Sequence, residues 1–568
     1  MNLFLERNMS PRLTIWDDNN ARHSFELAVP KECTSDEFMP PRLVDVGKQG
    51  DDCRLIPTDG LDPKPYIAIS YCWGRIGSQL TTTGATIRDR ESGIPIDQLP
   101  KAIVDAVWLV RKLGVKYMWL DALCIIQDDH ADWSHHVSQM SDVYRSATLV
   151  IAAGSSNSSG DSFLDTGDRK EGATVRFAYQ GRAGDIYCAP FPASGVHDDY
   201  RGIYGCYDPV FRRAWTLQEC ILPTRLVVFS STELQWVCRE HMVCEAGHQD
   251  SNKHHYSIYS IKEPTDAYHY WHNQVMEYTR RRMTLEKDKL PALAGVAIEI
   301  SKIARDTYIG GVWEQNLIYD LCWERYLWEV EPFAPMSAYR APTFSWASVG
   351  GNVFYNNDAI AGGPGISYPI HYTDGTQSIG HTKYYSTLLE AKTNPISEEN
   401  PFGEITDGFI RIQGPLTEAL IYDHKDTRPG RRYTHTARFI DTIEEFDFHC
   451  DIPLAQYTFP DVTDDSASTQ DSTTALRASP GEETPVQGAK VWLLNIGYFP
   501  HRYNNPKECP YVWLGLLILG KSRKPGAFER IGYKNLMWPP GHSTWPHREL
   551  DKLRPFATGK STVEITVI

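Results

Sequence analysis

Two short polar clusters carry most of the groups with which this chain could bind or transform a ligand. The first has the sequence SYCWG and follows an apolar run. It supplies the hydroxyl of Ser70 and the ring faces of Tyr71 and Trp73. Gly74 ends the cluster, and a residue without a side chain lets a ligand come close to the backbone. The alternative is structural, with the aromatic rings closing the end of a buried strand.

The second cluster lies within the segment YMWLDALCIIQDD, which begins at Tyr117. Asp121 could orient a ribose hydroxyl or a partner's backbone, or it could cap the following turn, which is the commoner use of Asp at such a position. Gln127 adds an amide to the same segment. Cys124 stands in an apolar run, and its nearest base is only the sequence neighbour His130, so a buried thiol is favoured over a nucleophile.

The third candidate is the pair Trp215 and Glu219. Residues four apart on a helix share a face, so this spacing sets an indole plane beside a carboxylate. A pyridinium base could stack on the tryptophan, while the carboxylate holds a ribose or stabilises an oxocarbenium-like transition state. The alternative is a solvent-facing Glu219 beside a core Trp215.

Both clusters follow apolar runs that are predicted strands, so one sheet would position them. Residues 99–114 between these strands have apolar side chains at three- and four-residue spacing, which predicts a helix. After the second strand we expect a helix from Trp133 to Arg145, capped by Asp132, and a third strand at residues 148–153. Alternating strands and helices predict a parallel α/β sheet, and ligands bind such sheets beyond the carboxyl ends of the strands. The two clusters are therefore expected to meet at one edge.

The rest of the chain changes in periodicity and composition along its length. Residues 461–488 are rich in Ser, Thr and Asp and poor in large apolar residues, which predicts a disordered loop. The predicted regions are an irregular N-terminal extension at 1–40, an α/β domain at 41–245, a helical region at 246–350 and a β-rich region at 351–568.

The composition limits the class of function. A formal net charge of −15 argues against nucleic-acid binding, which depends on clustered Lys and Arg. We identify no secretory signal, and no apolar run approaches the roughly 18 residues that span a bilayer. The 12 cysteines form no Cys-x-x-Cys pair and no His pair has a metal-binding spacing, so we expect reduced thiols and no metal site. Together these features predict a cytoplasmic protein without a membrane span.

Five motifs, taken in order, resemble the fungal heterokaryon incompatibility (HET) domain. They read YIAISYCWG, LPKAIVDAVWLVRKLG, YMWLDALCIIQDD, MSDVYRSATLVIAA and RAWTLQE, and they begin at Tyr66, Leu99, Tyr117, Met140 and Arg213. A set of this length in this order is highly specific, and the later segments LQWVC, DKLPALAG and PTFSWAS extend the similarity. The resemblance implies a role in fungal non-self recognition and programmed cell death.

The resemblance also implies a fold and a chemistry for the site. It implies a flavodoxin-like α/β core similar to Toll/interleukin-1 receptor (TIR) domains, several of which cleave NAD with a Trp-x-x-x-Glu helix. Trp215 and Glu219 match that pattern. Glu219 is thereby the catalytic candidate, and Arg213 and Trp215 join the ligand-binding set. NAD is a candidate substrate, and no resident cofactor is expected.

The sequence leaves three hypotheses open. In the first, a strand-end cleft binds a nucleotide-like ligand, and Glu219 stabilises positive charge as nicotinamide leaves, which would make the chain an NAD glycohydrolase. In the second, the cleft receives an incompatibility partner protein, and the chain signals by assembly or oligomerisation without chemistry. In the third, the scaffold serves small-molecule biosynthesis. The residues expected to line the cleft are Ser70, Tyr71, Trp73, Asp121 and Gln127.

Overall fold

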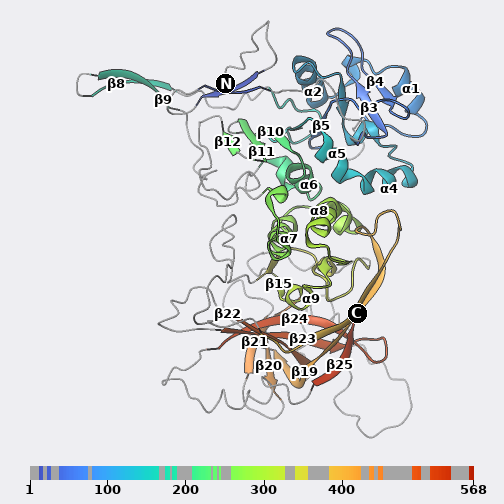
Figure 1. Ribbon diagram of the computed structural model, residues 1–568, viewed down its shortest axis with the longest axis vertical. Helices are drawn as coiled ribbons and strands as arrows, with labels where there is room; N and C mark the ends of the chain where they lie inside the picture. The colour runs from blue at the N-terminus through green and yellow to red at the C-terminus, as the bar shows by residue number, and fades with distance from the viewer. Residues whose placement is uncertain are drawn as a thin grey trace.

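The structure of the protein is a computed structural model. Figure 1 shows an elongated molecule with three parts stacked along its long axis: an α/β part, a helical part in the middle and a β-rich part that contains the C-terminus. The described residues are 12–16, 22–26, 38–74, 80–164, 173–179, 182–188, 208–231, 234–239, 242–244, 257–325, 339–355, 383–423, 434–439, 445–451, 489–500, 512–538 and 562–568.

A mixed eight-stranded sheet forms the centre of the α/β part. In spatial order its strands are β12 (Met242–Cys244), β11 (Leu234–Cys238), β10 (Arg225–Phe229), β7 (Leu149–Ala152), β5 (Tyr66–Ser70), β6 (Tyr117–Trp119), β3 (Arg42–Asp45) and β4 (Arg54–Pro57). The central strands β10, β7, β5 and β6 are parallel. Counted along the chain they run 2-1-3-4, which is the flavodoxin-like order. The predicted α/β fold with a parallel core is confirmed, and the narrower TIR-like comparison stays a prediction.

The central strands are short and apolar because both of their faces are covered. Every residue of β5 and of β7 is buried, as is typical of parallel strands between two helical layers. In the register of the sheet, Ser70 is paired with Ala152 of β7, and Ala68 is paired with Trp119 of β6. Because side chains alternate along a strand and paired residues point the same way, these four side chains share one face of the sheet.

The crossovers between the parallel strands supply the helices. α1 (Ile87–Ser92) and α2 (Lys101–Lys112) lie between β5 and β6. α3 (Asp121–Cys124), α4 (His130–Ser138) and α5 (Met140–Ser146) lie between β6 and β7, and α6 (Thr216–Ile221) precedes β10. Parallel crossovers are right-handed, and these two run in opposite directions along the sheet, so α2 covers one face and α5 the other.

The helix predicted from Trp133 to Arg145 is in fact two helices, because the chain breaks at Gln139 between α4 and α5. The cap of α4 is Asp129, whose carboxylate accepts two backbone N–H groups of the first turn. Asp132 instead pairs with Arg42 of β3 at 2.5 Å. A distant arginine therefore takes the carboxylate that the sequence pattern assigned to the cap.

The helical part packs directly on α6. It contains α7 (Pro264–Thr279), α8 (Ala294–Ala304), α9 (Leu317–Asp320) and two antiparallel strand pairs, β13 (Tyr308–Ile309) with β14 (Val312–Trp313) and β15 (Trp323–Arg325) with β16 (Val353–Tyr355). The amide N–H of Gly295 donates to the side-chain carbonyl of Gln218, and a Cβ at this glycine would lie 2.7 Å from that oxygen. One cluster of buried apolar residues runs through both parts, so they share a core.

The β-rich part is a nine-stranded sheet that closes on itself, because β19 pairs with both β20 and β22. It also encloses an apolar cluster of its own. Its strands are β17 (Lys383–Tyr384), β18 (Thr387–Pro395), β19 (Ile405–Asp423), β20 (Thr434–Phe439), β21 (Glu445–Cys450), β22 (Ala489–Pro500), β23 (Val512–Lys521), β24 (Ala527–Trp538) and β25 (Thr562–Val567).

Arg530 of β24 ties the β-rich part to the helical part. Its guanidinium pairs with Asp451 at 2.6 Å and donates to the backbone carbonyls of Leu321 and Trp323. The same group lies 3.4 Å from the centre of the Trp323 ring. A buried arginine that meets one carboxylate, two carbonyls and a ring face fixes how the two parts meet.

Two hairpins lie outside these three parts. Within the predicted N-terminal extension, β1 (Arg12–Trp16) pairs antiparallel with β2 (Arg22–Glu26), and β8 (Ala173–Tyr179) pairs with β9 (Arg182–Cys188). The predicted loop at 461–488 falls outside the described residues.

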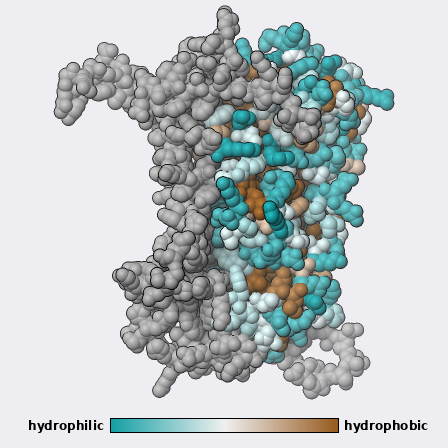
Figure 2. Space-filling model, in the orientation of Figure 1, coloured by the Kyte–Doolittle hydropathy of each residue, from teal (hydrophilic) through white to brown (hydrophobic). Residues whose placement is uncertain are grey.

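The described surface is mainly hydrophilic on the face shown in Figure 2, with small apolar patches in the middle and lower parts of the molecule. Among the helices of the described ranges, none combines the length and apolar character needed to cross a membrane.

Candidate functional site

The site begins at the point where β5 ends on the face covered by α5 and α6. Ser70 is the last residue of β5, and its neighbours on this face are the small Ala68 and Ala152. Small side chains leave room above the sheet, which Tyr144 of α5 and Glu219 of α6 fill. This position lies between β5 and β7, where the strand order reverses and where open α/β sheets bind ligands.

Glu219 is the centre of the site and is 5% exposed. The pKa of Glu219 is raised to about 7, because burial raises it most, Arg213 lowers it and the nearby Asp121 carboxylate raises it further. The hydroxyls of Ser70 and Tyr144 also lower this pKa. A carboxyl group with such a pKa exchanges its proton near neutral pH, which is the property expected of an acid, a base or a charge-stabilising group.

Arg213 supplies the positive charge of the site. Its guanidinium donates to the backbone carbonyl of Tyr71, at the end of β5. The turn that carries it is held by the backbone of Arg282, which accepts from Ala214 at 2.9 Å. Burial alone would lower the pKa of Arg213, but the carboxylates of Glu219 and Asp121 raise it overall. One arginine therefore stands between two carboxylates in a largely buried setting.

Asp121 links the second strand-end cluster to the first. The indole N–H of Trp73 donates to both carboxylate oxygens of Asp121, at 3.0 and 2.8 Å, and the amide of Ala122 donates at 2.8 Å. Burial raises the pKa of Asp121, while Arg213 and the Trp73 hydrogen bond lower it. The two clusters thus meet through Trp73 and Asp121, as the sequence predicts.

Two buried polar atoms at the site lack a hydrogen bond. The Ser70 hydroxyl is close enough to Glu219 to affect its pKa, but it makes no hydrogen bond of normal geometry. The indole nitrogen of Trp119 also has no partner, and its ring lies 5.6 Å from that of Tyr144 in an edge-on contact. Buried polar groups are nearly always paired, so the Ser70 hydroxyl is an unusual feature beside the Glu219 carboxylate.

The part of the chain that matches a known protein family contains all the residues of this site. A model of the heterokaryon incompatibility (HET) family matches residues 66–219, a range that starts at β5 and ends on Glu219. The chain contains a HET domain. It is also similar to heterokaryon incompatibility protein 6, OR allele, of Neurospora crassa, with 31% identity over 104 residues. That match covers 17% of this chain and 15% of the relative, so the two proteins are compared over a small part of their lengths. No solved structure gives a significant match.

Trp215, one of the predicted site residues, makes its hydrogen bond outside the α/β part. Trp215 lies just before α6, and its indole N–H donates to Asp288 at 3.0 Å, in the segment before α8. Its ring meets Trp133 edge-on, with 6.4 Å between the ring centres. Trp215 therefore connects the HET domain to the helical part, and α6, the helix that carries Glu219, starts at Thr216, one residue after Trp215.

Two further predicted residues have structural surroundings. The side-chain amide of Gln127 donates to the backbone carbonyls of Asp121 and Ile125, so it shapes the turn after α3. Burial raises the pKa of the Cys124 thiol to about 12, which suits an inert core thiol. Gly74 adopts a φ of +92°, and a Cβ there would lie 2.6 Å from the Cβ of Ser158. These residues shape the walls of the site more than its chemistry.

Tyr144 is the site residue that the sequence did not reveal. It lies within the helix predicted from Trp133 to Arg145, and its ring is buried, but its hydroxyl lowers the pKa of Glu219. The available signal was the tyrosine itself, because a fully buried phenol usually needs a polar partner. Among the described residues, no group of three or more His, Cys, Asp or Glu side chains is placed to hold a metal ion.

Proposed function

We propose that this protein acts in heterokaryon incompatibility, in the cytoplasm, as a cell-death effector whose HET domain cleaves the N-glycosidic bond of NAD. The family match and the name of the Neurospora relative support the biological role. The observation that carries the chemistry is Glu219, a buried carboxyl group with a pKa of about 7 that faces both strand-end clusters. A position across the sheet from those clusters would instead favour a pure binding module.

The proposed reaction is hydrolysis at the anomeric carbon of the nicotinamide ribose. The bond from this carbon to the nicotinamide nitrogen breaks, and its electron pair leaves with nicotinamide. The ionised Glu219 stabilises the positive charge that develops on the ribose, as acidic residues do in glycoside cleavage. Water then forms the new carbon–oxygen bond and releases one proton, which gives ADP-ribose.

Arg213 and Ser70 have supporting roles in this reaction. Arg213 favours the ionised form of Glu219, and so keeps the carboxylate available at neutral pH. The unpaired hydroxyl of Ser70 can bond a ribose hydroxyl beside that carboxylate. Asp121 acts in the opposite direction by raising the pKa of Glu219, so the balance between one arginine and two carboxylates sets the working pH.

The burial of the site implies control over access. Glu219 is 5% exposed and Tyr144 is 1% exposed, so a nucleotide reaches the carboxylate only after the side chains above it move. We expect low activity in the resting protein and a rise when an activating partner or self-assembly opens the site.

The experiment is to incubate the purified protein with NAD and to measure nicotinamide release. The measurement is made at low protein concentration and again after the protein has been concentrated to promote assembly, without a cross-linker. We expect release by the wild-type protein and loss of at least 100-fold in Glu219→Gln, since a charge-stabilising group is worth about 10²–10³ in rate. Glu299→Gln on α8 is the matched control, because Glu299 is also buried but pairs with Lys302 at 2.7 Å. Equal activity of Glu219→Gln and wild type would refute the catalytic role. Absence of release in every state, with incompatibility retained by Glu219→Gln in hyphae, would favour signalling by assembly.

A further inference from the structure

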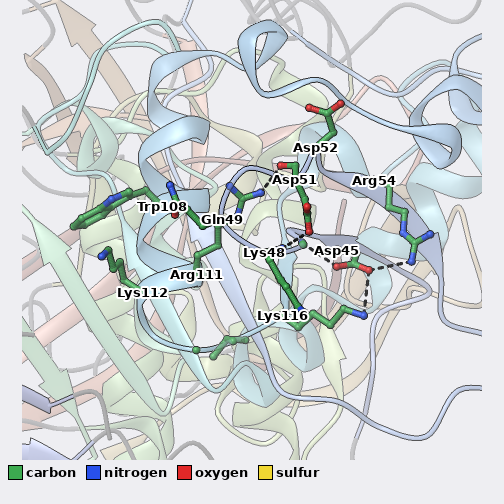
Figure 3. Close-up of a pocket in the computed structure, with 13 residues that line it drawn as sticks. Asp45, Lys48, Gln49, Asp51, Asp52, Arg54, Trp108, Arg111, Lys112 and Lys116 are labelled. Carbon is green, nitrogen blue, oxygen red and sulfur yellow. Dashed lines mark hydrogen bonds and ion pairs between the residues drawn. The ribbon is translucent and has the colours of Figure 1, made fainter. Parts of the chain in front are cut away.

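A concavity of the α/β part lies at the end of the parallel strands opposite Glu219. Figure 3 shows that its walls come from the turn between β3 and β4, the C-terminal end of α2 and the segment before β6. Asp45 is level with Tyr117, the first residue of β6, so the pocket sits at the amino ends of the parallel strands. Its volume is about 860 Å³, within the range of small-molecule sites. We propose that this pocket binds a nucleoside polyphosphate, with its phosphates on the lysines and its base on Trp108.

The charge of the pocket favours an anion although the whole chain is acidic. Five basic side chains face three carboxylates along the pocket walls, whereas the chain carries a net charge of −15. A local positive excess in an acidic protein attracts and holds phosphate groups. The charged lining residues are Asp45, Lys48, Asp51, Asp52, Arg54, Arg111, Lys112 and Lys116.

The carboxylates of the pocket are occupied by backbone donors. Asp45 accepts from the amide of Gly47 at 3.0 Å, Asp51 from the amide of Lys48 at 2.7 Å, and Asp52 from the amide of Ile96 at 3.2 Å. These hydrogen bonds hold the carboxylates in the turns of the pocket wall and occupy part of their accepting capacity.

The cations keep their charge available. Arg54 and Lys116 both contact one oxygen of Asp45 at 3.3 Å, so two positive charges share one negative charge. Arg111 donates to the backbone carbonyls of Val46 and Asp51, which fixes its position without neutralising it. An anion can therefore add to these groups without breaking a one-to-one ion pair.

Trp108 indicates that the anion carries a planar ring. It is a large apolar side chain on α2 that remains 39% exposed at the pocket wall. The Lys112 ammonium lies over one face of its ring, 5.6 Å from the ring centre, so a base would stack on the other face. Aromatic rings of this kind bind nucleobases by stacking, worth roughly 1–3 kcal/mol per base. Phosphate-binding lysines next to an exposed indole match the two ends of a nucleotide.

The test is to titrate the full chain with ATP by calorimetry. We expect one saturable site, which Lys48→Glu and Lys112→Glu each weaken by roughly tenfold or more. Lys262→Glu, an exposed lysine before α7, makes the same charge change away from the pocket and is expected to leave the affinity unchanged. Thermal melts of each variant confirm that it folds. Equal affinity of wild type and the two pocket variants, or equal weakening by Lys262→Glu, would overturn the proposal.

Two further measurements complete the test. One distinguishes base stacking on Trp108 from phosphate binding, and the other distinguishes binding in this pocket from binding at the Glu219 site. Trp108→Ala is expected to weaken ATP several-fold and to leave inorganic tripolyphosphate unchanged. Tripolyphosphate binding as tightly as ATP in the wild type would refute the base-stacking role. Glu219→Gln is expected to keep full ATP affinity, and loss of binding in that variant would place the nucleotide at the other edge of the sheet. The result is thus independent of whether the chain cleaves NAD.

Discussion

Arg213 and Glu219 are the opposed charges of the buried site at the end of β5. Burial raises the pKa of Glu219 to about 7, and the Arg213 guanidinium is the strongest influence in the opposite direction. In return, Glu219 is the carboxylate that most raises the pKa of Arg213. This pair holds a carboxyl group near its titration point at neutral pH, which is the property that the proposed reaction requires.

The stability of the HET domain should depend on pH through Glu219. Below about pH 4.5 the carboxyl group is protonated in both states, and between about 4.5 and 7 only the unfolded chain releases the proton. Folding stability therefore falls across this window, by roughly 3 kcal/mol, and is level above it. Glu219→Gln lacks this loss, so its melting temperature relative to wild type should rise from pH 4.5 to pH 8. A difference that is constant with pH would show that the carboxyl group is not perturbed.

Trp215 should matter for stability more than for chemistry. Trp215→Phe keeps most of the ring but removes the indole N–H that bonds Asp288 at 3.0 Å. A hydrogen bond to a carboxylate contributes about 1.5–3 kcal/mol, so we expect a lower unfolding midpoint in urea and nicotinamide release within a few-fold of wild type. Asp288→Asn and the double variant complete a cycle that isolates the pair. Lost activity with unchanged stability would place the Trp215 ring at the ligand.

Gly74 should tolerate alanine poorly, and Gly50 offers a matched comparison. Both residues have positive φ, +92° and +94°, but a Cβ at Gly50 meets nothing within 4 Å, whereas at Gly74 it lies 2.6 Å from Ser158. Both substitutions pay a conformational cost of about 1 kcal/mol, and Gly74→Ala adds an overpacking cost of about 1–3 kcal/mol. Equal melting temperatures for the two variants would contradict this account of the strand end.

Arg530 should be essential for docking the β-rich part. Arg530→Met leaves the buried Asp451 without its 2.6 Å partner, which typically costs about 3–5 kcal/mol. Arg411→Met removes an exposed arginine that pairs with Glu390 and Glu564, so a change below about 1 kcal/mol is expected. Limited proteolysis should release a C-terminal fragment faster in Arg530→Met alone. Equal cleavage of both variants would show that this buried pair does not fix the two parts.

The sequence predicts the local elements of the HET domain well. The runs at β5, β6 and β7 are apolar over several residues, and α2 has a clear helical period, so their types follow from local pattern. Both strand-end clusters meet as predicted, because carboxyl ends of parallel strands share one edge. The Trp73 and Asp121 hydrogen bonds are the direct result.

The failures come from partners that are distant in the chain. Asp132 fits a helix cap by its local pattern, but Arg42 from β3 takes its carboxylate. The role of Trp215 as a ligand-stacking residue stays a prediction, but its hydrogen bond to Asp288 was not evident from the sequence. Similarly, the closure of the C-terminal sheet depends on β19 pairing with β22 across a long stretch of chain. The periodicity of a local segment does not show which distant residue or strand it will contact.

The most direct test of the proposed function is the pH dependence of nicotinamide release at NAD concentrations well below saturation, where the rate reports kcat/KM. If the ionised Glu219 carries the reaction, kcat/KM should rise about tenfold per pH unit below a midpoint near 7 and become level above it. Asp121→Asn should move this midpoint to lower pH, because the Asp121 carboxylate raises the pKa of Glu219. A rate that is flat from pH 5 to 9, or the same profile in Glu219→Gln, would contradict the account.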